Sequence, residues 1–193
     1  MSEAVAGLPV MEFASAKDWE RWLARNHGKS DGVWLKIAKK GTGVDTVGYP
    51  EAVDVALCYG WIDGLRHKHD DVYFRQRMTP RKARSRWSKI NREKAEGLVA
   101  DGRMREAGMR EVEAARADGR WDAAYAGQRT IEVPGDLARA LRGNARARRA
   151  FEALDSRNRY AILYRIHDAK RPETRARRIE QFVTMLAEGR TIY

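Results

Sequence analysis

The residues best suited to chemistry lie in two stretches, an apolar run around Asp63 and a basic segment from Thr79 to Asn91. Asp63 stands between Ile62 and Gly64, where a buried and unpaired carboxylate would be strongly destabilising. Such a carboxylate is tolerated when a cation or a set of N–H donors holds it. We therefore expect Asp63 to be buried and paired with an arginine or with backbone N–H groups of residues 79–91.

The basic segment is suited to binding an anion, because cationic residues recur from Arg75 to Arg92 with no acidic residue among them. Arginine presents a planar pair of donors to a carboxylate or phosphate, and neutral polar side chains add further hydrogen bonds. Aromatic walls would complete a pocket for a small ligand. The first hypothesis is an anionic small-molecule pocket. Its candidate ligand-binding residues are Trp61, Asp63, Arg81, Arg84, Ser85, Trp87 and Asn91.

Two other functions stay open. Basic residues interleaved with Trp and Tyr could follow a phosphate backbone and stack on bases, which would make nucleic acid the partner. Against this, no nucleic-acid-binding module is recognisable, and acidic residues interrupt the basic field beyond Arg92. Asp63 could alternatively serve as the general base of an enzyme of unknown class, although a structural carboxylate is the stronger interpretation. No catalytic residue is assigned.

The remaining reactive residues predict neither a nucleophile–base pair nor a metal site. Cys58 lies on the apolar face of a predicted helix, which favours an inert buried thiol. No histidine is spaced to act as a base for Cys58 or Ser85. The segment His67–Asp71 holds two histidines and two aspartates but has no spaced partner elsewhere, so no metal is predicted. No cofactor is predicted either.

A body of the α+β class is expected to position these residues. Apolar periodicity and capping residues predict a helix from Ser15 to about His27 and another from Tyr49 to Gly60. Alternating patterns predict a strand over residues 33–39 and a hairpin from residues 61–65 and 72–77. Further helices are expected over residues 91–100 and 107–117. Together these elements predict a small antiparallel sheet covered by helices.

The composition changes after this body, since all six tryptophans occur by position 121. Residues 127–134 are a plausible linker, and helical stripes follow over residues 137–141, 145–154, 156–169 and 173–188. We therefore expect an α+β body of residues 1–126, with a Trp-rich core and the basic pocket. Residues 127–193 are expected to form an all-helical segment that docks on this body.

Charge and composition restrict the partners and the compartment. The net charge is +11, yet residues 1–64 contain 7 Lys and Arg against 9 Asp and Glu. The positive charge therefore lies beyond residue 64, where an anionic partner is expected. No apolar run reaches the roughly 18 residues that span a bilayer, and residues 1–9 do not resemble a secretory signal. With a single cysteine, the chain is expected to be cytoplasmic and to have no membrane partner.

Several blocks of the sequence resemble the YdeI/OmpD-associated family, whose members are also called bacteriocin-protection proteins. The resemblance extends over nearly the whole chain. It implies a small bacterial cytoplasmic protein with a role in tolerance of bacteriocins or antimicrobial peptides, without an agreed reaction or an established catalytic residue. The blocks are residues 51–64, Thr79–Arg81 with Ser85, Trp87, Ser88 and Asn91, residues 119–125, and residues 173–179.

Overall fold

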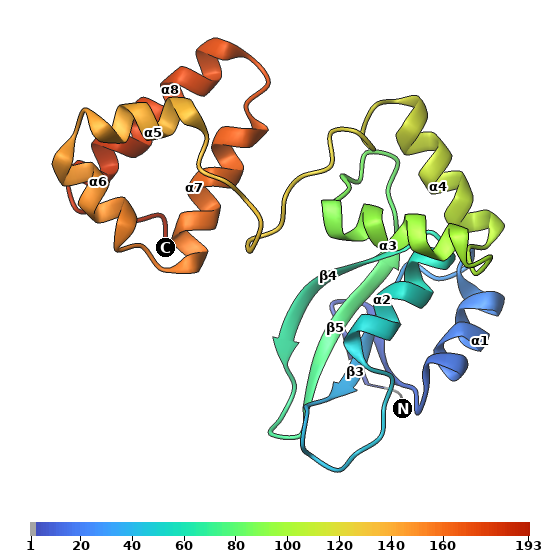
Figure 1. Cartoon of the computed structure of the whole chain (residues 1–193). Helices are drawn as coiled ribbons and strands as arrows, with labels where there is room; N and C mark the ends of the chain where they lie inside the picture. Colours follow the sequence, from blue (N-terminus) through green and yellow to red (C-terminus); the bar gives the residue numbers. More distant parts are fainter. Residues whose placement is uncertain (1–2) are drawn as a thin grey trace. The chain divides into compact units, whose positions relative to one another are not determined.

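The computed structural model describes residues 3–193, which form two compact units. One unit ends at Ala124 and the other runs from Tyr125 to Tyr193 (Figure 1). Each unit has a hydrophobic core of its own. The first unit combines a sheet with helices and the second is helical, so the predicted α+β class is confirmed.

The sheet of the first unit has five strands in the order β1-β2-β3-β5-β4. The sequence predicted three strands in an antiparallel sheet, but β2 and β3 pair in parallel, which makes the sheet mixed. The helix α1 connects β2 to β3, and such a crossover is what a parallel pair requires. The β2 strand contains Pro9, which weakens a strand pattern, and it was not predicted. The strands are β1 (Ala4–Val5), β2 (Leu8–Glu12), β3 (Val33–Ala38), β4 (Trp61–Lys68) and β5 (Tyr73–Pro80).

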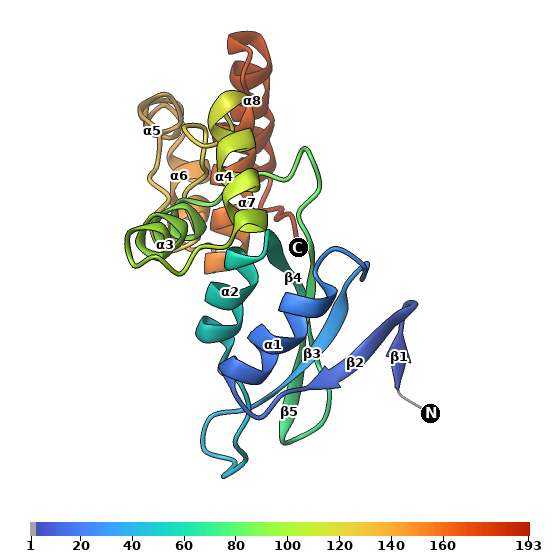
Figure 2. The same ribbon diagram turned by 90° about the vertical axis from the view of Figure 1, so that its right-hand side faces the viewer.

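Two helices, α1 (Ala16–Asn26) and α2 (Tyr49–Cys58), lie on the same face of the sheet (Figures 1 and 2). The Ser15 hydroxyl caps α1 by accepting the Asp18 N–H, as the sequence predicted. Trp19 of α1 is fully buried, and its indole Nε1 donates to the Ala52 carbonyl of α2 at 3.1 Å. The apolar stripe of α1 therefore packs on both the sheet and the neighbouring helix.

The helices α3 (Lys89–Ala100) and α4 (Glu106–Ala117) complete the first unit. Helix α4 approaches the end of α2 so closely that a Cβ at Gly108 would lie 2.5 Å from the carbonyl oxygens of Leu57 and Cys58. Gly60, which ends α2 as predicted, has a φ of +73° that other residues rarely adopt. Glycine is therefore required at both positions of this contact.

The second unit consists of four helices, all at positions that the sequence predicted. They are α5 (Gly135–Arg142), α6 (Ala145–Glu152), α7 (Ser156–Asp168) and α8 (Pro172–Ala187). Arg175 of α8 donates two hydrogen bonds to the Asp136 carboxylate of α5, at 2.5 and 3.0 Å. This pair holds the pKa of Asp136 below its ordinary value.

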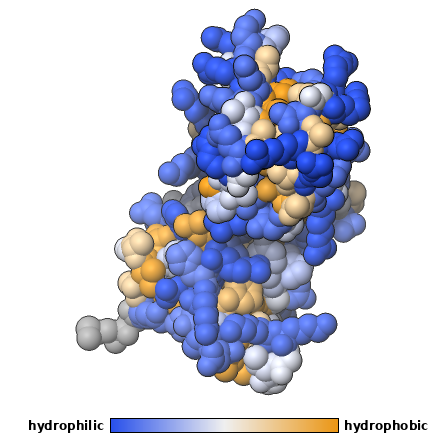
Figure 3. Space-filling model, turned by 90° about the vertical axis from the view of Figure 1, so that its left-hand side faces the viewer, coloured by the Kyte–Doolittle hydropathy of each residue, from blue (hydrophilic) through white to orange (hydrophobic). Residues whose placement is uncertain are grey.

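The surface in Figure 3 is mostly hydrophilic, with small hydrophobic groups between the polar side chains. In residues 3–193, no helix is both long and apolar enough to span a bilayer. The large exposed hydrophobic residues are Val44, Leu65, Ile90, Val99 and Tyr193.

Replacing Gly108 with alanine should destabilise the protein by about 1–3 kcal/mol, because the added methyl group overpacks the contact between α2 and α4. Urea unfolding followed by far-ultraviolet circular dichroism measures this loss. Gly97→Ala in α3 is the matched control, since nothing lies within 4 Å of the position of its Cβ. That variant should gain up to about 1 kcal/mol from helix propensity. Equal effects of the two substitutions would contradict the packing account.

Candidate functional site

Asp63 is tied to a helix and not to the basic segment. It lies on β4 opposite Met78 and is half-buried. Its Oδ2 accepts a hydrogen bond from the Tyr49 hydroxyl at 2.7 Å. Tyr49 is the first residue of α2, so this bond connects the start of the helix to an edge strand. Across residues 3–193, no donor of the segment Thr79–Asn91 reaches Asp63, which corrects the predicted pairing.

The surroundings of Tyr49 form a connected polar cluster. The Arg66 guanidinium lies between the rings of Tyr49 and Phe74, 4.5 and 4.4 Å from their centroids. Its Nε donates to Gln76 Oε1 at 3.2 Å, and Gln76 Nε2 donates to the Gly64 carbonyl at 2.9 Å. An irregularity in the β4–β5 register falls between Asp63 and Arg66. Burial, reinforced by the bond to Asp63, raises the pKa of Tyr49, so the phenol remains a donor at neutral pH.

Arg81 is a structural residue of the segment that follows β5, which we call the basic loop (residues 81–88). Its guanidinium lies 3.6 Å from the centroid of the Trp87 ring, and its side chain is 7% exposed. Nη1 donates to the Arg86 carbonyl at 3.3 Å, and the backbone N–H donates to the Gly60 carbonyl at 2.9 Å. Arg81 thus joins both ends of the basic loop and anchors it to the end of α2.

A tight turn presents the exposed part of the basic loop. The Ser85 N–H donates to the Lys82 carbonyl at 2.7 Å, and Ser85 Oγ accepts the Lys82 N–H at 2.9 Å. Arg120 Nη1 fixes this turn by donating to the Ser85 carbonyl at 2.8 Å. Arg84 at the tip is exposed. The Ser85 hydroxyl is therefore engaged within the turn.

The other predicted residues, Asn91 and Trp61, belong to different parts of the first unit. Asn91 is in the first turn of α3, where its backbone N–H donates to the Ser88 cap. Trp61 belongs to the core, and its Nε1 donates to the His27 carbonyl at 3.0 Å. Its ring packs edge-on against Trp19 and Trp22 of α1. The structure thus brings Arg81, Arg84, Ser85, Trp87 and Asn91 into one loop and helix start, whereas Trp61 and Asp63 have other partners.

Trp121 is a neighbour of the basic loop that the sequence analysis did not assign to the site. Its ring centroid lies 4.8 Å from that of Trp87 in an edge-on arrangement. Arg116 lies 5.2 Å above the Trp121 ring, and Arg92 donates to the Trp121 carbonyl at 3.5 Å. The block of residues 119–125 is aromatic-rich, but it lies far from residue 87 along the chain, so the sequence did not indicate this contact.

The Trp87 indole and three cationic side chains at the basic loop have no acceptor or counter-ion within residues 3–193. The Trp87 indole Nε1 is buried and makes no hydrogen bond. Lys82, Arg84 and Lys89 are exposed and form no ion pair. This region therefore combines a buried donor with unneutralised positive charge.

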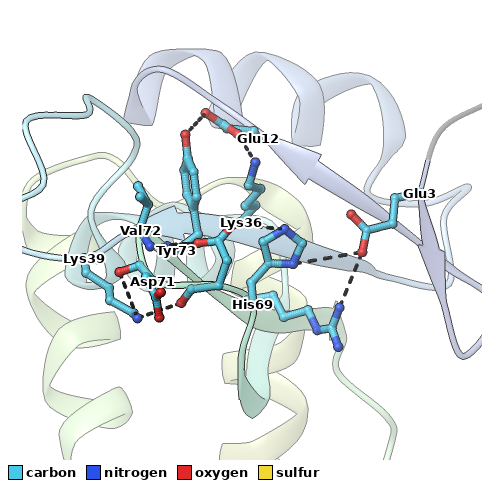
Figure 4. Close-up of polar contacts among 10 residues, drawn as sticks. Glu3, Glu12, Lys36, Lys39, His69, Asp71, Val72 and Tyr73 are labelled. Atoms are coloured by element: carbon cyan, nitrogen blue, oxygen red, sulfur yellow. Dashed lines mark hydrogen bonds and ion pairs between the residues drawn. The ribbon is translucent and has the colours of Figure 1, made fainter.

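The other reactive residues have structural partners. Cys58 is buried, and burial raises the pKa of its thiol to about 11, which leaves it protonated and unreactive at neutral pH. In the β4–β5 turn, the Asp70 carboxylate accepts the N–H groups of Val72 and Tyr73. The His69 ring lies between Glu3 and Asp70, on the sheet face that also carries an ion pair of Lys36 with Glu12 (Figure 4).

Two family models match this chain, one in each of its two compact units. Residues 11–111, more than half of the chain, match a domain of unknown function (DUF8412). Residues 130–189 match the family described as bacteriocin-protection, YdeI or OmpD-associated. The chain belongs to the DUF8412 family, and its C-terminal part is similar to the second family. No curated protein and no solved structure gives a significant match.

The YdeI/OmpD-associated match is narrower than the expected resemblance. Of the blocks that suggested the family, only residues 173–179 lie inside the matched part. The blocks over residues 51–64 and 79–91 lie in the DUF8412 match instead. The basic loop therefore lies within the DUF8412 match, and α5 to α8 lie within the YdeI/OmpD-associated match.

Tyr49→Phe should destabilise the protein by about 1–2 kcal/mol at neutral pH, because it removes the donor to Asp63. Because the folded pKa of Tyr49 is raised, the wild type should lose stability as pH rises above about 10, where the unfolded phenol ionises first. The variant should lose less over this range. Urea unfolding at pH 7, 9 and about 10.5 measures both effects. Parallel pH dependences in the two proteins would contradict this role of Tyr49.

Proposed function

We propose that the protein binds a small anionic ligand at the basic loop, and that this binding contributes to tolerance of bacteriocins or antimicrobial peptides. The observation that carries the proposal is the buried indole N–H of Trp87, which has no acceptor in residues 3–193. More than about nine in ten buried polar groups in native proteins have a hydrogen-bond partner. A carboxylate or phosphate oxygen would supply the acceptor, and the cations of the loop would attract it.

The surroundings of Trp87 support binding of an anion in particular. Arg92 Nε is also buried without a hydrogen bond, and its nearest carboxylate, Glu96, lies 3.7 Å away. Lys82, Arg84 and Lys89 add positive charge that no acidic side chain of the described chain neutralises. The hydrogen bonds of the turn and the stacked Arg81 pre-organise these groups, which reduces the entropic cost of binding.

A nucleic acid is the alternative partner, since exposed lysine and arginine side chains attract any phosphate backbone. The aromatic rings beside them give a single strand little surface for stacking, because Trp87 and Trp121 are only 1% and 6% exposed. Rings buried to this extent cannot stack on bases, which is a main source of affinity for single strands. Catalysis by Asp63 receives less support than binding, because its Oδ2 accepts the bond from Tyr49.

We place this action in the cytoplasm, because a chain with one buried thiol and no possible internal disulfide suits a reducing compartment. Fractionation of cells that express the untagged full-length protein should recover it with the cytoplasmic markers. Recovery in the periplasmic or membrane fraction would refute this part of the proposal.

Binding is tested by titrating the full chain with inorganic phosphate and recording the tryptophan fluorescence. Arg81 is unsuitable for the test because its substitution would disturb the loop, so the variants are Arg84→Gln and Arg84→Lys. Both should weaken binding about tenfold or more, since lysine keeps the charge but loses the planar pair of donors. Arg110→Gln, an exposed arginine on α4, is the control for loss of one charge and should bind like the wild type.

A titration with a random oligonucleotide at two salt concentrations separates the alternative. Tight oligonucleotide binding that Arg84→Lys retains, and that weakens steeply with the logarithm of salt concentration, would favour nucleic acid and refute the small-ligand proposal. Phosphate binding that Arg110→Gln weakens as much as Arg84→Gln would also refute it.

A further inference from the structure

We propose that the second unit holds a separate binding site for a small organic anion with a flat apolar body. The site is a cavity of about 580 Å³ on one side of α7, within the size range of typical small-molecule pockets. All of its lining residues belong to the second unit, whereas the basic loop belongs to the first. They are Gln128, Arg157, Tyr160, Ala161, Tyr164, Arg165 and Tyr193.

One face of α7 forms the floor of this cavity. The lining positions 157, 160, 161, 164 and 165 are spaced three and four residues apart, which places them on the same side of a helix. The opposite side of α7 carries Ile162, Leu163 and Ile166, which are buried in the core of the second unit. Core packing thus fixes the helix and directs two tyrosines and two arginines into the cavity.

The buried side-chain amide of Asn158 fixes the C-terminal segment that supplies Tyr193 to the cavity. Asn158 is 5% exposed, and its Oδ1 accepts the backbone N–H groups of Ile192 and Tyr193, each at 3.0 Å. Its Nδ2 donates to Asp155, the cap of α7, at 3.1 Å. Asn158 therefore connects the start of α7 to the segment that ends with Tyr193. The Tyr193 ring then lies 4.0 Å from the Arg157 guanidinium.

The charge of the lining selects an anion. It contains two arginines and no acidic residue. Arg165 donates one bond to the Ala161 carbonyl and makes no ion pair within residues 3–193, so its charge is available to a ligand. The neighbouring cavity between α5 and α8 differs in this respect, because its Arg175 is already paired with Asp136.

The shape and chemistry of the walls select the rest of the ligand. Tyr160, Tyr164 and Tyr193 line the cavity, and the rings of Tyr160 and Tyr164 also pack on each other with their centroids 5.7 Å apart. Aromatic side chains of this kind pack favourably against a planar apolar group. Guanidinium groups at the same cavity pair with a carboxylate or phosphate through two parallel hydrogen bonds. An aryl carboxylate meets both requirements, with its ring against the tyrosines and its carboxylate on Arg165 or Arg157.

The test uses 2-naphthoate as the probe and 2-naphthamide as its uncharged analogue. Two-dimensional amide NMR of the full-length protein follows the titration. Naphthoate should bind this site saturably, with shifts centred on α7 and residues 191–193, and the amide should bind it about tenfold more weakly or worse. Arg165→Gln and Arg157→Gln should each weaken naphthoate binding by a similar factor. Arg157 is exposed, so at least this variant is expected to keep the fold.

Arg148→Gln on α6 removes the same charge from an exposed position outside the cavity, and Arg84→Gln removes it from the basic loop. Neither should change naphthoate binding by more than about twofold. The proposal is overturned by absence of saturation at millimolar concentrations, by equal affinity for the amide, by equal losses in the control variants, or by shifts confined to residues 3–124. If Arg84→Gln loses phosphate binding but keeps naphthoate binding, the result concerns the proposed function of the basic loop. It does not contradict the site on α7.

Discussion

The contact between the Arg81 guanidinium and the Trp87 ring is the interaction on which the arrangement of the basic loop depends. A loop with so many like charges would be extended by their mutual repulsion unless a specific contact closed it. Here a cation–π contact and a hydrogen bond to the Arg86 carbonyl bring the ends together. The Trp121 ring packs edge-on against Trp87, and the Gly60 carbonyl anchors Arg81 to the end of α2.

Local patterns in the sequence predicted most elements of the fold. The Ser15 and Ser88 caps, the stop at Gly60 and the apolar stripes of α7 and α8 act within a few residues, so they can be recognised without the structure. The parallel β2 strand could not be predicted, because it has five residues, includes Pro9 and is stabilised by pairing with β3. Its pattern alone carries too little information.

The contacts among the candidate site residues were predicted only in part, because several of them join elements that are separate in the sequence. Anion binding by the basic segment stays a prediction, and Arg84, Ser85 and Trp87 lie together in the basic loop. The partner of Asp63 was predicted wrongly, because Tyr49 lies on another element and the chain gives no local signal of their contact. Trp61 was assigned to a pocket by its place in the sequence, but the three-dimensional packing of α1 places it in the core. The family matches add that the basic loop and the cavity on α7 lie in different domains.

The central claim, that the Arg81–Trp87 contact holds the basic loop closed, is tested most directly by amide hydrogen exchange at Ser85. Its N–H donates to the Lys82 carbonyl at 2.7 Å within an exposed turn, so its protection reports the order of the loop. Arg81→Lys should speed exchange at Ser85 by about tenfold or more while amides of α1 stay protected, because lysine cannot reproduce the stacked planar group. Equal exchange at Ser85 in the wild type and the variant would contradict the claim.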